Sequence, residues 1–104
     1  MGRKTTHTPR RPAEASALTD PSFEERFNHA LRTVLRASRH DAGLTQRDLA
    51  LKLKRPQSFV ARVEFGERRV TVSDLMQFAA ALEVLPSTLI ERVEHWLSSS
   101  KREP

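Results

Sequence analysis

The chain has 104 residues, of which 30% are charged, and its formal net charge at pH 7 is +5. This length fits one small domain, and the absence of cysteine excludes a disulfide framework and a thiolate zinc site. No apolar run approaches the roughly 20 residues needed to cross a bilayer, and the polar start of the chain lacks the apolar segment of a secretory signal. We therefore expect a soluble cytoplasmic protein.

Residues 1–19 are rich in Thr, Pro, Ala and Arg and contain almost no large apolar side chains. Such a segment buries too little surface to offset its ordering entropy, so we predict a disordered basic tail. The segment is either a plain solvated tail or an arm that follows DNA phosphates with its basic side chains, which are Arg3, Lys4, Arg10 and Arg11.

A long helix is predicted to begin at Asp20-Pro21, because aspartate caps helix starts and proline fits the first helical position. Apolar residues then recur at three- and four-residue steps up to residues 41–43. We expect Gly43 to end this helix in the left-handed conformation. The predicted buried stripe consists of Phe23, Phe27, Leu31, Val34, Leu35 and Ser38.

Two more helices are predicted to begin with the spacing of a capping box, in which Asp replaces the usual Glu or Gln. Thr45 with Asp48 opens a helix that runs to about Leu53. Thr71 with Asp74 opens a second helix, for which the predicted buried stripe is Val72, Leu75, Met76, Ala79 and Leu82.

Proline marks the two remaining helices. Pro56 suits the first turn of a helix that ends before Gly66. After Pro86, either Ser87 or Thr88 begins the last helix, and residues 98–104 are expected to form a disordered tail. The last helix carries a wide apolar stripe of Leu89, Ile90, Val93, Trp96 and Leu97.

Residues 45–65 have the features of two short helices joined by a tight turn, which is the helix-turn-helix arrangement. The small side chain of Ala50 suits the point where the helices cross, and Val60 and Val63 suit the inner face of the second helix. The opposite face is then free to enter a major groove, where Gln pairs with adenine and Arg with guanine. That face carries Gln57, Ser58, Ala61 and Arg62.

The excess positive charge is concentrated around this helix pair. Residues 36–69 contain nine Lys and Arg against four acidic residues, whereas the rest of the chain is balanced. A concentrated basic face is expected for a protein whose partner is a polyanion. The alternative is a solvated surface with a chance imbalance of charge.

In order and spacing, Arg39, the tetrapeptide GLTQ (43–46), the dipeptide LA (49–50) and Glu64 with Gly66 resemble the DNA-binding domain of the phage-repressor/Cro-like (Xre) family. The resemblance covers about residues 31–92. It implies an all-α, five-helix, lambda-repressor-like domain, which we place at residues 20–97. The function it implies is sequence-specific binding of double-stranded DNA by a transcription regulator, and we expect a repressor that acts as a homodimer.

The resemblance also implies a role for individual residues. Thr45 and Gln46 fall where the family holds a DNA phosphate, and Arg39 with Glu64 falls on its structural salt bridge. Arg55 precedes the recognition helix, where it can reach a phosphate or a base edge. Further phosphate contacts fall on Arg68 and Arg69, and the base-contacting positions are Gln57, Ser58 and Arg62.

Two positions depart from the family pattern. The turn position that is usually glycine is Lys54, so the turn is either strained by a positive φ or slightly remodelled. Phe59 stands where small or polar residues are common. We expect it to pack inward beside the next helix, and the alternative is contact with a thymine methyl group.

One helix-turn-helix reads only a few base pairs, and such proteins commonly pair two copies on half-sites one helical turn apart. The last helix offers a dimer interface formed by Leu89, Val93, Trp96 and Leu97, although part of this stripe must close the domain's own core. Phe23 and Phe27 can cover the stripe within one chain or across a dimer.

We do not expect an enzyme, a metal site or a cofactor. The four histidines do not form a metal-ligand cluster, and no phosphate-binding loop or nucleophile arrangement is recognisable. The main alternative is an interaction module on the same fold, such as an antitoxin that neutralises a toxin and uses its DNA-binding face to regulate its own operon.

Overall fold

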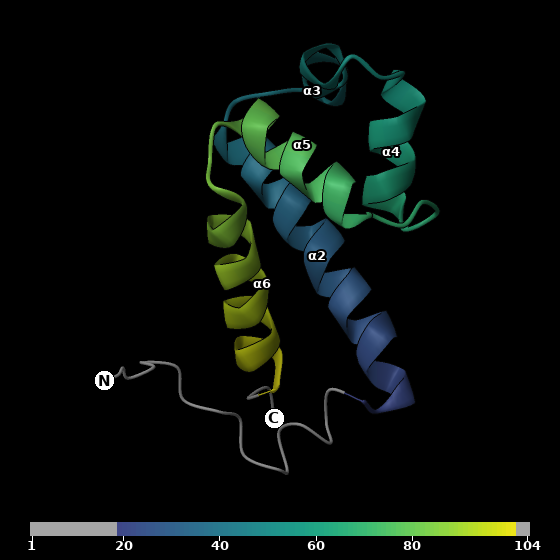
Figure 1. Ribbon diagram of the computed structural model, residues 1–104, viewed down its shortest axis with the longest axis vertical. Helices are drawn as coiled ribbons and strands as arrows, with labels where there is room; N and C mark the ends of the chain where they lie inside the picture. Colours follow the sequence, from purple (N-terminus) through teal and green to yellow (C-terminus); the bar gives the residue numbers. More distant parts are fainter. Residues whose placement is uncertain (1–18, 102–104) are drawn as a thin grey trace, which may run out of the picture.

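The computed structural model describes residues 19–101, which form five α-helices and contain no strand (Figure 1). The all-α, five-helix fold expected from the sequence is confirmed. The tail predicted at residues 1–19 lies outside the described residues except for Thr19. The helices are α2 (Pro21–Asp41), α3 (Gln46–Leu53), α4 (Gln57–Phe65), α5 (Val72–Leu82) and α6 (Pro86–Lys101).

The arrangement has a long pair and a short pair of helices. α2 packs along α6, α3 packs against α4 at one end of the molecule, and α5 contacts α2, α3 and α6 (Figure 1). α4 and α6 lie at opposite edges of the view in Figure 1. α6 therefore lies away from α4, one face of which is exposed to solvent.

The helix boundaries follow the local signals in the sequence. The Asp20 carboxylate accepts a hydrogen bond from the Ser22 backbone N–H at 2.8 Å, and Pro21 occupies the first helical position. α2 ends at Asp41, and Gly43 has a φ of +73°, as predicted. The last helix differs: it begins at Pro86 itself and runs to Lys101, so residues 98–101 are helical where a disordered tail was expected.

The two predicted capping boxes are complete. In the first, the Thr45 hydroxyl accepts from the Asp48 backbone N–H and the Asp48 carboxylate accepts from the Thr45 N–H, both at 3.0 Å. Thr71 and Asp74 form the same pair of bonds at the start of α5, again at 3.0 Å. Each box satisfies backbone donors that the first turn of a helix leaves open.

The hydrophobic core lies where all five helices meet. Ala50, Val60 and Val63 are buried in it, which confirms the packing predicted for the helix-turn-helix. The buried apolar side chains are Ala30, Leu31, Val34, Leu35, Leu49, Ala50, Phe59, Val60, Val63, Phe78, Ala79, Leu82, Leu89 and Val93.

The buried stripe of α5 was predicted in part incorrectly. Val72 is 78% exposed and Met76 is 53% exposed, whereas Phe78 is 1% exposed. The helix is turned so that Phe78 packs against Phe59, with ring centroids 5.9 Å apart. The stripe facing the core therefore follows residues 75, 78, 79 and 82, and Val72, at the first helical position, lies outside it.

The stripe predicted on α2 is buried from Leu31 onward and only partly buried before it. Phe27 packs against the core from its edge, and Phe23 stacks on Phe27 with ring centroids 5.7 Å apart. Ser38 is also buried, and its hydroxyl is satisfied by a hydrogen bond from the Arg92 guanidinium of α6 at 2.7 Å. No helix within the described part of the chain is long and apolar enough to cross a membrane.

The capping aspartates predict that the fold is weakened by acid. The hydrogen bond from the Ser22 backbone lowers the pKa of Asp20, and that from the Thr45 backbone lowers the pKa of Asp48, from an ordinary value of 3.8. Because the folded pKa lies below the unfolded pKa, the stabilisation is present above about pH 4 and is lost as the pH falls through the folded pKa.

Thermal unfolding followed by circular dichroism between pH 6 and pH 2.5 would measure this loss. We expect the unfolding temperature of the wild type to decrease once the pH is below about 4, because aspartate carboxylates take up protons there. The variant in which Asp20 and Asp48 are both replaced by Asn should lose less over the same interval. Equal losses in the two proteins would contradict the assignment.

Candidate nucleic-acid interface

The exposed face of α4 is the centre of the candidate site. Gln57, Ser58 and Arg62 are all exposed, while Val60 and Val63 on the opposite face are buried. Gln57 is the first residue of the helix, and Arg62 lies more than one turn further along it. The sequence-predicted base-contacting residues therefore share one free helical surface.

The turn before α4 keeps the geometry that glycine usually provides. Lys54 has a φ of +58°, so the strained alternative is the one observed, at a cost on the order of 1 kcal/mol. Its backbone N–H donates to the carbonyl of Leu51, which closes the end of α3. From the sequence, Pro56 is expected in the first turn of α4. In the structure Pro56 is instead the N-cap of α4, one residue before the helix begins.

The start of α3 faces the start of α4 across an open hollow of about 640 Å³. Its lining includes Thr45, Gln46 and Arg47 from one helix start and Gln57 from the other. A helix N-terminus presents backbone N–H groups and a partial positive charge to an anion. The predicted phosphate-binding residues Thr45 and Gln46 thus lie beside one predicted base-contacting residue, Gln57.

The Gln46 side chain has an additional role that the sequence did not reveal. Its amide Nε2 donates to Glu64 Oε1 at 2.9 Å, which links the start of α3 to the end of α4. In this structure the Gln46 amide holds the two helices in register. A DNA phosphate at this position would therefore be bound by backbone N–H groups of the first turn, or by the Gln46 amide while it also donates to Glu64.

The predicted Arg39–Glu64 salt bridge is present. Arg39 Nε and Nη2 donate to the two carboxylate oxygens of Glu64 at 2.7 Å and 3.1 Å, and Nη1 donates to the Leu44 carbonyl at 2.8 Å. The side chains of Arg39 and Glu64 are only 9% and 5% exposed. This bidentate pair, together with Gln46, joins α2, α3 and α4 from beneath the exposed face.

A second ionic cluster lies at the other side of α4. Arg55 Nη1 donates to Asp74 Oδ1 at 3.0 Å, and Arg68 Nη2 lies 3.7 Å from Asp74 Oδ2. The Phe59 ring, 8% exposed, lies beneath both guanidinium groups, so the predicted inward packing of Phe59 is confirmed. The role of Asp74 was not predicted, because the capping box with Thr71 already accounted for it in the sequence.

Asp74 remains charged despite its surroundings. Burial by itself raises the pKa of this carboxyl, but hydrogen bonds from Thr71 and Arg55 and the charge of Arg68 leave the pKa below its ordinary value. A carboxylate that accepts several hydrogen bonds is stabilised in its ionised form. Asp74 is therefore a fixed negative charge between two arginines.

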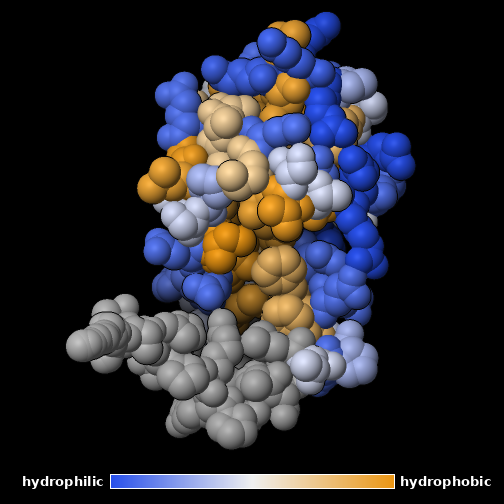
Figure 2. Space-filling view, in the orientation of Figure 1, coloured by the Kyte–Doolittle hydropathy of each residue, from blue (hydrophilic) through white to orange (hydrophobic). Residues whose placement is uncertain are grey.

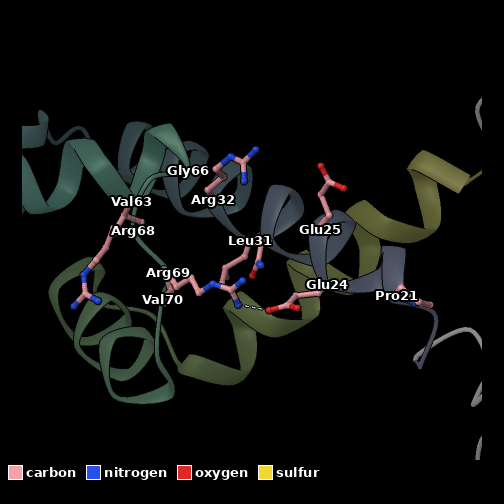
Figure 3. Close-up of a pocket in the computed structure, with 11 residues that line it drawn as sticks. Pro21, Glu24, Glu25, Leu31, Arg32, Val63, Gly66, Arg68, Arg69 and Val70 are labelled. Atoms are coloured by element: carbon pink, nitrogen blue, oxygen red, sulfur yellow. Dashed lines mark hydrogen bonds and ion pairs between the residues drawn. The ribbon is translucent and has the colours of Figure 1, made fainter.

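Arg69 projects toward α2. It is 75% exposed at its side chain and forms an ion pair with Glu24. The pair borders a hollow of about 400 Å³ between the start of α2 and the segment after α4, also lined by Glu25 and Arg32 (Figure 3). Exposed pairs of this kind contribute little, so Arg69 can exchange Glu24 for another anion.

Two of the residues predicted for the dimer interface are unavailable. Leu89 and Val93 are 0% exposed, because they close the core of their own domain. Trp96 and Leu97 are half-buried at the edge of the core, and the Trp96 ring contacts His29 edge-on with centroids 5.3 Å apart. Among residues 19–101 there is no group of three or more His, Cys, Asp or Glu side chains that could hold a metal ion.

Known proteins share this arrangement. The chain matches the family described as "Helix-turn-helix domain" over residues 30–93. The structure of an XRE-family like protein from Pseudomonas syringae pv. tomato str. DC3000 has a TM-score of 0.69 and 34% sequence identity, covering 76% of this chain and 96% of that one. A comparison with curated proteins found no match.

Two other solved structures are also similar. The restriction-modification controller protein C.AhdI from Aeromonas hydrophila is 32% identical, with a TM-score of 0.54 and coverage of 64% of this chain and 97% of that one. The clp gene regulator ClgR from C. glutamicum is 25% identical, with a TM-score of 0.62 and coverage of 66% and 90%. The fold and the site thus define a helix-turn-helix protein. Within that class, the chain belongs to the Xre family of DNA-binding transcription regulators.

Replacing Glu64 by Ala should destroy folding and DNA binding together. The variant leaves Arg39 buried without its partner, which typically costs about 3–5 kcal/mol, and it also removes the acceptor of the Gln46 amide. Chemical denaturation would measure the first effect and fluorescence anisotropy with labelled duplex the second. Normal stability with unchanged affinity would show that the pair does not support the α4 face.

Proposed function

We propose that this protein binds double-stranded DNA at specific sequences and represses transcription as a homodimer. The observation that carries the proposal is the exposed α4 face, on which Gln57, Ser58 and Arg62 project from a helix anchored by Val60 and Val63. An α-helix of ordinary diameter fits the major groove, where these side-chain types distinguish base pairs. A repressor would act by occupying DNA that polymerase needs.

Affinity and specificity fall on different residues in this proposal. The start of α3, with Thr45 and Gln46, and three arginines beside α4, Arg55, Arg68 and Arg69, contact phosphates. These contacts supply most of the affinity and make it dependent on salt. Gln57, Ser58 and Arg62 contact base edges and supply the sequence preference.

The names of the similar proteins agree with a regulatory role. One is a gene regulator and another is a restriction-modification controller protein.

Selection of bound fragments from a random pool of duplex DNA tests the proposal directly. We expect a short sequence repeated as an inverted pair about one helical turn apart. Recovery of no enriched sequence would contradict specific binding.

Two arginine variants test the division of roles. Replacing Arg62 by Ala should cost roughly 1–3 kcal/mol of discrimination at one base position. Replacing Arg69 by Ala should weaken binding to all sequences alike and reduce the slope of log K against log salt by about one. Titration of both variants against the selected duplex and its single-base changes would compare them. Equal losses on every sequence would contradict the assignment.

The homodimer is proposed to form at the end of the molecule away from α4. Figure 2 shows apolar side chains gathered where α6 and α2 face each other below α5. Phe23 and Phe27 of α2 and Trp96 and Leu97 of α6 are among the half-exposed apolar residues of these two helices. A hollow of about 440 Å³ lies between Trp96 and Leu97 of α6 and polar side chains of α2. An interface here would leave both α4 faces free to meet successive major grooves.

Replacing Leu97 by Glu should convert the dimer into a monomer, because a charge would then be placed in the apolar interface. The matched control is Val72→Glu on α5, which is 78% exposed and should leave the association unchanged. Sedimentation equilibrium would report the molecular mass of each protein. A monomeric wild type, or dissociation by the α5 variant alone, would contradict this interface.

A further inference from the structure

Two arginines that flank α4 in the sequence converge on one aromatic ring. Arg55 precedes the helix and Arg68 follows it, yet their guanidinium carbons lie 3.7 Å and 5.1 Å from the centroid of the Phe59 ring. The attraction between a guanidinium and a ring face orients the planar cation parallel or oblique to the ring. Phe59 itself is fixed, because it packs on Phe78 in the core.

The same two arginines share one carboxylate. Asp74 Oδ1 accepts from Arg55 at 3.0 Å, and its Oδ2 lies 3.7 Å from Arg68. The carboxylate cannot turn away, because Oδ2 also accepts the Thr71 backbone N–H that caps α5. The position of Asp74 is therefore set by the helix start, and the arginines are arranged around it.

The cluster is layered from the interior outward. The Asp74 side chain is 7% exposed, whereas those of Arg55 and Arg68 are 29% and 36% exposed. A guanidinium has five N–H donors, and the carboxylate occupies only part of that capacity. Both arginines thus keep unused donors on side chains that are partly exposed to solvent.

We propose that Asp74 is a positioning residue that holds Arg55 and Arg68 as a two-arginine site for a DNA backbone phosphate beside α4. The inference rests on the proposed function and adds to it the group that orients these two contacts. Because Asp74 and Phe59 fix both side chains before DNA arrives, less conformational freedom is lost on binding. Planar, charge-assisted donors in a fixed array suit the geometry of a phosphate.

Charge and positioning predict opposite signs for the loss of Asp74. As a plain negative charge near DNA, Asp74 would weaken binding, and its removal would strengthen it. As a positioning group, its removal would release two long side chains and weaken binding. The sign of the change in affinity therefore decides between the two roles.

The experiment compares Asp74→Asn with Glu67→Gln on the selected duplex at one salt concentration. Each variant replaces a carboxylate by a neutral amide, so each loses one negative charge. Asn at position 74 keeps an oxygen that can cap α5. Glu67 is the matched control because it is exposed and lies one residue before Arg68. We expect Asp74→Asn to bind roughly tenfold more weakly than the wild type, the scale of two side chains losing their preorganisation. Glu67→Gln should bind as tightly as the wild type or more tightly.

Two further comparisons distinguish the loss of arginine positioning from a folding defect. Replacing Arg55 and Arg68 together by Lys keeps the charge and the cap of α5 but removes the planar forks, and it should weaken binding to a similar extent. When both arginines are replaced by Ala, the additional change Asp74→Asn should no longer weaken binding. Thermal unfolding of each variant would confirm that it is folded at the assay temperature.

Tighter binding by Asp74→Asn, matching Glu67→Gln, would overturn the positioning role and leave the proposed function in place. Undiminished binding by the double Lys variant would also overturn it. Failure of the wild type to bind any duplex would overturn both proposals.

Discussion

The structure depends on a buried ion pair beneath the candidate DNA-binding surface. Arg39 and Glu64 lie 25 residues apart in the chain and are almost fully buried, and Gln46 completes the link between three helices. Burying two charges is costly unless their hydrogen bonds are satisfied, and here both carboxylate oxygens and three guanidinium nitrogens have partners. The ion pair ties α4 to α2, and the Gln46 bond ties α4 to α3, so α4 is anchored on both neighbours while its outer face stays exposed.

Apolar packing fixes the inner face of α4, and charged side chains surround its outer face. Its inner face is held by Val60, Val63 and Phe59, which leaves Gln57 and Arg62 on a surface that the core does not constrain. Arginines on either side of the helix lie against the ring and carboxylate of a second cluster. A surface of this kind combines a rigid helix with cations in fixed places, which is what recognition of a charged, grooved polymer requires.

Much of the fold was predictable because its signals are local. Capping boxes, the proline at a helix start and the left-handed Gly43 each depend on a few neighbouring residues. The family pattern added the Arg39–Glu64 pair, which no local signal gives. Other details were not predictable, because they depend on how the helices are rotated in the core: the bond from Gln46 to Glu64, and which residues of the α6 stripe are buried. The outward turn of Met76 has the same cause, since a three- and four-residue pattern fits more than one helical face.

We expect α4 to present its outer face to DNA while α6 lies away from it. Titration of the protein with the selected duplex, followed by NMR through the backbone amide shifts, would test this orientation. We expect the large shifts at the start of α3, along α4 and in residues 66–71, with α6 little affected beyond any change in self-association. Shifts concentrated around Trp96 and Leu97, with Gln57 and Arg62 unmoved, would contradict it.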